Sequence, residues 1–169
     1  MPNWCWNTVE FTGEKKNLEN LNKLLHKTVE VQNATGYGQI LHSLEGAIDG
    51  YMFSISDIDL GDEYLSMTFE SRWNPIPNDM VRIAELFNLH FTYEYEESGM
   101  ELHGKYTFTI IDGESHLDEQ VANEEDIKAC RIYDEDGEDE GLDYEKLHDL
   151  IESNDMFSQS ITRINETVS

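Results

Sequence analysis

Basic residues are scarce in this sequence. Eleven Lys and Arg stand against 36 Asp and Glu, which gives a formal net charge of -25 over 169 residues. A protein grips nucleic acid by neutralising phosphates with Lys and Arg, so such a deficit disfavours direct binding of DNA or RNA. An anionic membrane surface is disfavoured for the same reason. We therefore expect neither nucleic acid nor membrane as a direct ligand.

Cysteine and long apolar runs are also missing. Cys5 and Cys130 are the only cysteines, and neither belongs to a CxxC or Cys/His spacing, so no disulfide framework and no zinc site is indicated. No stretch approaches the roughly 18 apolar residues of a membrane-spanning helix. The 38% of hydrophobic residues are nevertheless enough for one core. We expect a soluble, cytoplasmic globular protein.

The residue patterns of enzyme active sites are absent from the sequence. The six histidines are scattered singly, without an HExxH motif. The short Gly36-Tyr37-Gly38 stretch lacks the further glycine and the Lys-Ser/Thr pair of a phosphate loop. Cys130 has no histidine near it in sequence to act as a base for its thiol, so we interpret it as a small buried hydrophobe. We expect a non-enzymatic protein with no catalytic residue, no metal and no cofactor.

Acidic residues are concentrated toward the C-terminus. Residues 1–111 carry 17 acids and 7 bases, whereas residues 112–155 carry 18 acids and 3 bases. A shift of this size separates a core from an appended segment. We expect a first domain over 1–111 with an insertion at 28–50 that contains one short helix around 38–46. We also expect an acidic, mainly helical C-terminal extension over 112–169 that packs on the first domain or is appended to it.

The first domain alternates between a two-residue and a 3.6-residue hydrophobic period. The predicted elements are a strand at 4–11, a helix at 14–27, strands at 51–58 and 65–70, a helix at 79–88 capped by Asn78, and strands at 91–96 and 102–111. The order βαββαββ predicts an α+β fold, in which a ferredoxin-like antiparallel sheet carries both helices on one face.

The extension is predicted to contain helices at 116–123 and 143–153, on either side of an acidic run at 134–141. The run does not fit a calcium-binding EF-hand loop, because a loop beginning at Asp134 places Asp139 where glycine is required. A solvated acidic loop is the favoured interpretation.

Three short motifs resemble a known family. They are Met-Pro-Asn-Trp-Cys-x-Asn at 1–7, Ser-Arg-Trp-Asn-Pro-Ile-Pro at 71–77, and Tyr-x-Tyr-Glu-Glu-Ser-Gly at 93–99 followed by Gly104. Together they resemble the YubB-type ferredoxin-like domain of phage, plasmid and other mobile-element proteins. The resemblance covers residues 1–111 and implies the same fold, but it implies no activity and no catalytic residue. It also implies that the protein is located in the cytoplasm of a host cell.

The acidity itself points to an interaction function. Carboxylates two apart on a strand lie about 7 Å apart, and those at helical i, i+4 positions lie about 6 Å apart. Such spacings resemble those of phosphates, so the surface could attract a protein that grips nucleic acid. The residues expected on this surface are Glu94, Glu96, Glu97, Asp134, Asp136, Glu138, Asp139, Glu140, Asp143, Glu145, Asp149 and Glu152.

Two functions therefore remain open. The first is a nucleic-acid mimic that binds a basic, nucleic-acid-binding host protein and inhibits a host defence, as anti-CRISPR and anti-restriction proteins do. The second is an accessory protein–protein interaction module that uses its open sheet face or hairpin edge, with the charge serving only solubility.

Overall fold

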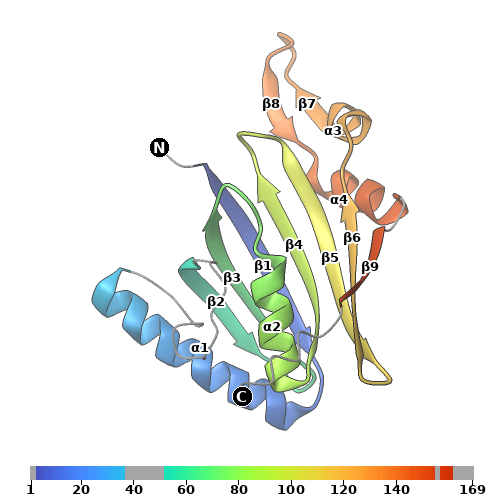
Figure 1. The fold of residues 1–169 in the computed structure, drawn as a ribbon. Coiled ribbons are helices and arrows are strands. Elements are labelled where there is room, and N and C mark those ends of the chain that lie inside the picture. The colour runs from blue at the N-terminus through green and yellow to red at the C-terminus, as the bar shows by residue number, and fades with distance from the viewer. Residues whose placement is uncertain (1–2, 37–51, 155–156, 162–169) are drawn as a thin grey trace.

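The computed structural model describes residues 3–36 and 52–154 in full, and residues 157–161 by their backbone (Figure 1). The elements, in chain order, are β1 (Trp4–Thr12), α1 (Lys15–Thr35), β2 (Phe53–Leu60), β3 (Tyr64–Arg72), α2 (Pro77–Phe87), β4 (His90–Glu97), β5 (Leu102–Ile111), β6 (Glu114–Val121), α3 (Glu124–Cys130), β7 (Arg131–Tyr133), β8 (Asp139–Leu142), α4 (Tyr144–Ser153) and β9 (Phe157–Ile161). None of these described helices is both long enough and apolar enough to cross a membrane.

One antiparallel sheet of seven strands dominates the described part of the chain. Its strand order is β2-β3-β1-β4-β5-β6-β9, and every neighbouring pair is antiparallel. The first four strands have the order of a ferredoxin-like sheet, with α1 and α2 as the two crossover connections. The predicted α+β class and ferredoxin-like arrangement are confirmed.

The two faces of the sheet differ in polarity. Every second residue of β1, from Cys5 to Phe11, is buried against the layer formed by α1 and α2, which lie together on one face (Figure 1). Leu18, Leu21 and Leu25 of α1 belong to the same core. The alternate residues of β1, Trp6, Thr8 and Glu10, point to the opposite face of the sheet, which we call the open face. An amphipathic helix layer thus covers one side of an alternating sheet.

Several predicted boundaries are wrong. Helix α1 continues to Thr35, so the first part of the predicted insertion at 28–50 is helical, while the short helix expected around 38–46 lies outside the described residues. Helix α2 begins at Pro77 rather than after Asn78, because proline suits the first turn, where its missing N–H has no partner to lose.

The predicted helix at 116–123 is also wrong. Residues 116–121 lie in β6, which pairs with β5 from Gly104 to Ile111, so the sheet does not end where the predicted first domain ends. Sheet pairing overrides the weak local pattern here. The C-terminal segment is therefore a mixture of strands and helices, and the description as mainly helical does not hold for its described part.

Residues 123–153 form a small unit of their own at one end of the sheet. Helices α3 and α4 enclose a second core made of Ile127, Cys130, Leu147 and Ile151. The β7–β8 hairpin projects beyond them (Figure 1). The helix predicted at 143–153 is confirmed, and the Asp143 side chain caps it by accepting a hydrogen bond from the Lys146 N–H at 3.1 Å.

The edge strand β2 is irregular. Its pairing with β3 shifts register twice, and Ser54 and Asp57 both have a left-handed backbone with φ of 50°. Non-glycine residues seldom adopt this conformation, and here it marks bulges in the strand.

Candidate functional site

The three sequence motifs converge on a buried polar cluster beneath the helix layer. The Asn7 side-chain amide donates to Ser71 Oγ at 3.0 Å, and the Tyr93 hydroxyl donates to Asn7 Oδ1 at 2.6 Å. The Tyr93 hydroxyl also accepts from the Ile76 N–H, while Ser71 Oγ donates to the Asn74 carbonyl. Each of these buried groups has a partner, so the cluster holds the loop before α2 in place.

Two other motif residues are equally buried. Glu97 is only 1% exposed, and its carboxylate accepts hydrogen bonds from the backbone N–H groups of Gly99 and Met100. Burial raises the pKa of the Cys5 thiol to about 11, which disfavours the nucleophilic thiolate. Both residues shape the fold, and Glu97 was wrongly expected on the acidic surface, because its carboxylate is needed to close the β4–β5 turn.

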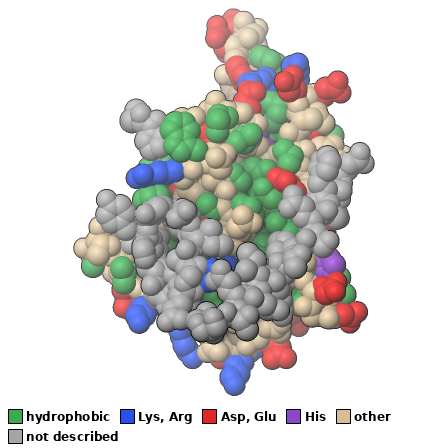
Figure 2. Space-filling view, in the orientation of Figure 1, with side chains coloured by type: hydrophobic (Ala, Val, Ile, Leu, Met, Phe, Trp, Pro, Cys, Tyr) green, Lys and Arg blue, Asp and Glu red, His purple; other side chains and the backbone are tan. Residues whose placement is uncertain are grey.

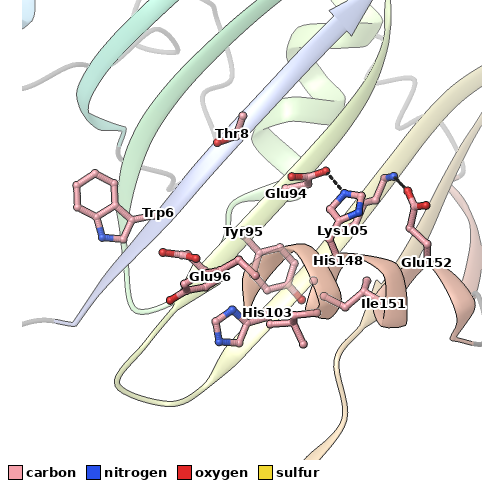
Figure 3. Close-up of a pocket in the computed structure, with 13 residues that line it drawn as sticks. Trp6, Thr8, Glu94, Tyr95, Glu96, His103, Lys105, His148, Ile151 and Glu152 are labelled. Carbon is pink, nitrogen blue, oxygen red and sulfur yellow. Dashed lines mark hydrogen bonds and ion pairs between the residues drawn. The ribbon is translucent and has the colours of Figure 1, made fainter. Parts of the chain in front are cut away.

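A cavity of about 330 Å³ lies on the open face of the sheet, beneath α4. Strands β1, β4 and β5 form its floor, and Tyr144, Leu147 and Ile151 of α4 contribute to its wall (Figure 3). Helix α4 therefore covers part of a face that ferredoxin-like sheets leave free. The cavity is at the small end of the range for ligand pockets.

One cross-strand row at the floor is paired with α4. Thr8, Glu94 and Lys105 are neighbours across β1, β4 and β5. Glu94 Oε1 lies 2.8 Å from Nε2 of His148, and Lys105 Nζ lies 2.7 Å from Glu152 Oε1 (Figure 3). These contacts hold α4 on the sheet and give both ionisable side chains of this row a partner.

The adjacent row is not compensated. Trp6, Glu96 and His103 are neighbours across the same three strands. His103 is 4% exposed, and its Nε2 has no hydrogen-bond partner among the described residues. Burial lowers the pKa of His103, which favours the neutral imidazole, and burial raises the pKa of Glu96. No hydrogen bond or ion pair of the Glu96 carboxylate to a described residue is found.

Aromatic side chains stand beside this second row. Trp6 is 55% exposed and Tyr144 is 51% exposed, and both line the cavity. The Tyr144 ring lies 6.1 Å from the His103 ring, centroid to centroid. Large exposed aromatic groups next to unpaired polar atoms are typical of a binding site.

The acidic residues predicted at the surface fall into three groups. Glu94 and Glu96 lie at the cavity, Asp134 to Glu140 lie on the β7–β8 hairpin, and Asp143, Glu145, Asp149 and Glu152 lie on or next to α4. Figure 2 shows acidic side chains gathered at the hairpin end of the molecule. The structure thus places most of the predicted residues on the β7–β8 hairpin and on or next to α4.

Several of these carboxylates have structural partners. Asp134 Oδ1 accepts from the N–H groups of Asp136 and Glu138 and so shapes the hairpin turn. Asp139 pairs with Arg131, and Asp143 caps α4. Within residues 3–36 and 52–154, no group of three or more His, Cys, Asp or Glu is arranged to hold a metal ion.

The chain also matches a protein family, described as the ferredoxin-like domain in Api92-like protein, over residues 50–145. This match covers more than half of the chain. The chain belongs to the Api92-like ferredoxin-like family. The family match runs past Ile111 through β6 and the hairpin, which supports treating them as part of one fold. Searches of curated proteins and of solved structures found no match.

Proposed function

We propose that the protein is a non-enzymatic, acidic interaction protein that binds a basic, nucleic-acid-binding host protein and blocks its nucleic-acid site. The single observation that carries the proposal is the high density of acidic residues in the β7–β8 hairpin and at the start of α4. Residues 134–145 contain eight acids and no base, and the hairpin among them projects from the end of the sheet. A dense group of one sign steers a partner of the opposite sign.

The side chains of the hairpin support an interface rather than a merely solvated loop. Glu135, Asp136, Glu138 and Glu140 are exposed. Beside them Ile132 is 43% exposed and Tyr133 is 58% exposed. An exposed aromatic residue ringed by charge is typical of an interface anchor, whereas charge that serves only solubility needs no apolar neighbour.

The origin of the protein is part of the same proposal. The three motifs resemble the YubB-type domains of phage and plasmid proteins, and such elements must evade host proteins that grip nucleic acid. An anti-CRISPR or anti-restriction role in the cytoplasm of the host cell follows by analogy. The inferred partner is a basic host protein, and neither nucleic acid nor membrane is a direct ligand.

Charge reversal on the hairpin tests the proposal. The substitutions Glu135→Lys, Asp136→Lys, Glu138→Lys and Glu140→Lys leave the Asp134 turn, the Asp139–Arg131 pair and the Asp143 cap intact. We expect them to weaken binding of a captured host protein at least about 100-fold. Wild-type binding should be displaced by duplex DNA and should weaken between about 0.05 M and about 0.5 M salt.

A matched control carries the same change in net charge elsewhere. Glu10, Glu30, Glu63 and Glu114 are exposed on other parts of the molecule, and their replacement by Lys should reduce binding far less. The proposal fails if the two quadruple variants bind the partner equally, or if duplex DNA does not compete.

A second candidate function has its own supporting observation. The exposed Trp6 and Tyr144 at the cavity favour an accessory module that binds its partner through the open face. The alternative route through the β4–β5 hairpin edge is wrong, because β5 is paired along its length with β6. Partner binding that resists high salt and is lost in Trp6→Ala would favour this candidate over the acidic hairpin.

A further inference from the structure

We propose that the cavity on the open face binds the guanidinium group of an arginine side chain presented by the partner protein. The proposal rests on the proposed function, because it assigns one anchoring residue of the same basic partner. Its evidence lies in the row formed by Trp6, Glu96 and His103 and in Tyr144 of α4.

The row places three complementary groups side by side. Trp6 pairs in register with Glu96, and Glu96 pairs in register with His103. Directly opposed residues in antiparallel strands have Cβ atoms about 5 Å apart. Figure 3 shows Glu96 between Trp6 and His103 at one end of the cavity, away from the pairs formed by His148 and Glu152. An aromatic ring, a carboxylate and an imidazole therefore lie next to one another at one end of the cavity.

The hydrogen-bonding capacity of this row is unused. Nε2 of His103 is buried without a partner among the described residues, although buried polar atoms are rarely left so. The neutral imidazole protonated at Nδ1 accepts a hydrogen bond at Nε2. The Glu96 carboxylate can accept two more. A ligand that donates several N–H groups satisfies both residues at once.

Arginine fits these groups better than other ligands. A guanidinium carries five N–H donors in one plane, remains charged, and stacks on aromatic faces such as those of Trp6 and Tyr144. Its charge complements Glu96, the only carboxylate at the cavity without a pair among the described residues. The nearby Glu94 and Glu152 oppose an anion, which disfavours a nucleotide.

A peptide titration tests the site. We would titrate the full chain with Gly-Arg-Gly and with Gly-citrulline-Gly, which has the same shape without the charge, and follow the amide signals of Glu96, His103 and Tyr144 by NMR. We expect the arginine peptide alone to shift these signals. Glu96→Gln should weaken it about tenfold, and Trp6→Ala about threefold.

Glu10→Gln is the matched control, because Glu10 points from the same face of β1 but does not line the cavity. It should leave the affinity unchanged. Equal binding of the citrulline peptide, or an effect of Glu10→Gln as large as that of Glu96→Gln, overturns the proposal. So does tighter binding of guanosine, or binding of methylguanidinium as tight as that of the peptide, which would indicate a free small molecule as the ligand.

The two proposals can fail separately. If Glu96→Gln leaves the affinity for the peptide unchanged while charge reversal on the hairpin abolishes partner binding, the arginine site is wrong and the proposed function stands. If the peptide needs Glu96 while hairpin reversal leaves partner binding intact, the site stands and the proposed function is wrong.

Discussion

Strands β1 and β4 carry a polar cluster on each of their two faces, and the clusters differ in how well they are satisfied. Under the helix layer, Asn7 and Tyr93 are hydrogen-bonded to each other and to the loop before α2. On the open face, Glu96 and His103 lie side by side without partners among the described residues. Alternation along β1 separates these environments by a single residue, because Trp6 of the open-face row and Asn7 are adjacent.

The difference distinguishes a structural role from a binding role. Burying polar groups is tolerated when each finds a partner, as around Asn7, and is costly when none is found, as at His103. Such a destabilising group is retained when a bound ligand supplies its missing hydrogen-bond partner. We therefore expect substitutions in the two clusters to affect stability with opposite signs.

The largest effect should follow Asn7→Ala. The substitution leaves the Tyr93 hydroxyl and Ser71 Oγ without their buried partner and opens a small gap. We expect the free energy of unfolding to fall by about 3 kcal/mol. Urea denaturation measures this loss, and a loss below about 1 kcal/mol would contradict a structural role for the cluster.

A smaller effect should follow Gln120→Leu, which tests how α4 is held over the open face. Gln120 is 8% exposed, and its side-chain amide donates to the carbonyls of Glu152 and Asn154. Losing both bonds should cost about 1 kcal/mol in the free energy of unfolding. In this variant, the backbone amides of α4 should also exchange with deuterium faster than those of α2. Equal protection of the two helices would show that α4 is held by other contacts.

His103→Leu should change stability in the opposite direction. Removing an unpartnered buried imidazole in favour of an apolar side chain of similar size should raise the free energy of unfolding by about 0.5 kcal/mol. The same variant should bind the arginine peptide more weakly. A large destabilisation would mean that His103 is a structural residue like Asn7.

The smallest effect should be the pH dependence of the stability difference between His103→Leu and the wild type. Burial lowers the pKa of His103 below its ordinary 6.5, so the unfolded chain takes up a proton at a pH where the folded chain does not. Its contribution therefore reduces stability as pH falls below 6.5 and vanishes above it. The advantage of His103→Leu over wild type should be larger at about pH 5 than at about pH 8 in urea denaturation. An unchanged difference would place His103 in a solvated environment.

Periodicity predicts the fold where the hydrophobic pattern is strong. The strand at 102–111 and the helix at 143–153 are close to their observed bounds, since alternation and an apolar stripe are clear in each. Strand β6 has no such pattern, because Leu117 and Val121 are its only aliphatic residues in an otherwise polar stretch. Its conformation is set by pairing with β5, which no local pattern reports.

The acidic hairpin could be located from composition alone, but the cavity could not. The cavity depends on the register of three strands and on the placement of α4, which begins 33 residues after the end of β5 in the chain. The available signal was Trp4 and Trp6, which put large apolar side chains on the polar face of an alternating strand. Glu97 was misplaced because alternation along β4 does not report the turn its carboxylate closes.

The irregular edge strand has a consequence for how the molecule meets other chains. With two register shifts and two left-handed residues, β2 cannot offer the evenly spaced N–H and C=O groups that an added strand requires. At this edge the sheet cannot grow by recruiting the backbone of a neighbour, so the protein resists fibril-like self-association there. Recognition is left to side chains, and a sequence as acidic as this one can be selective through them.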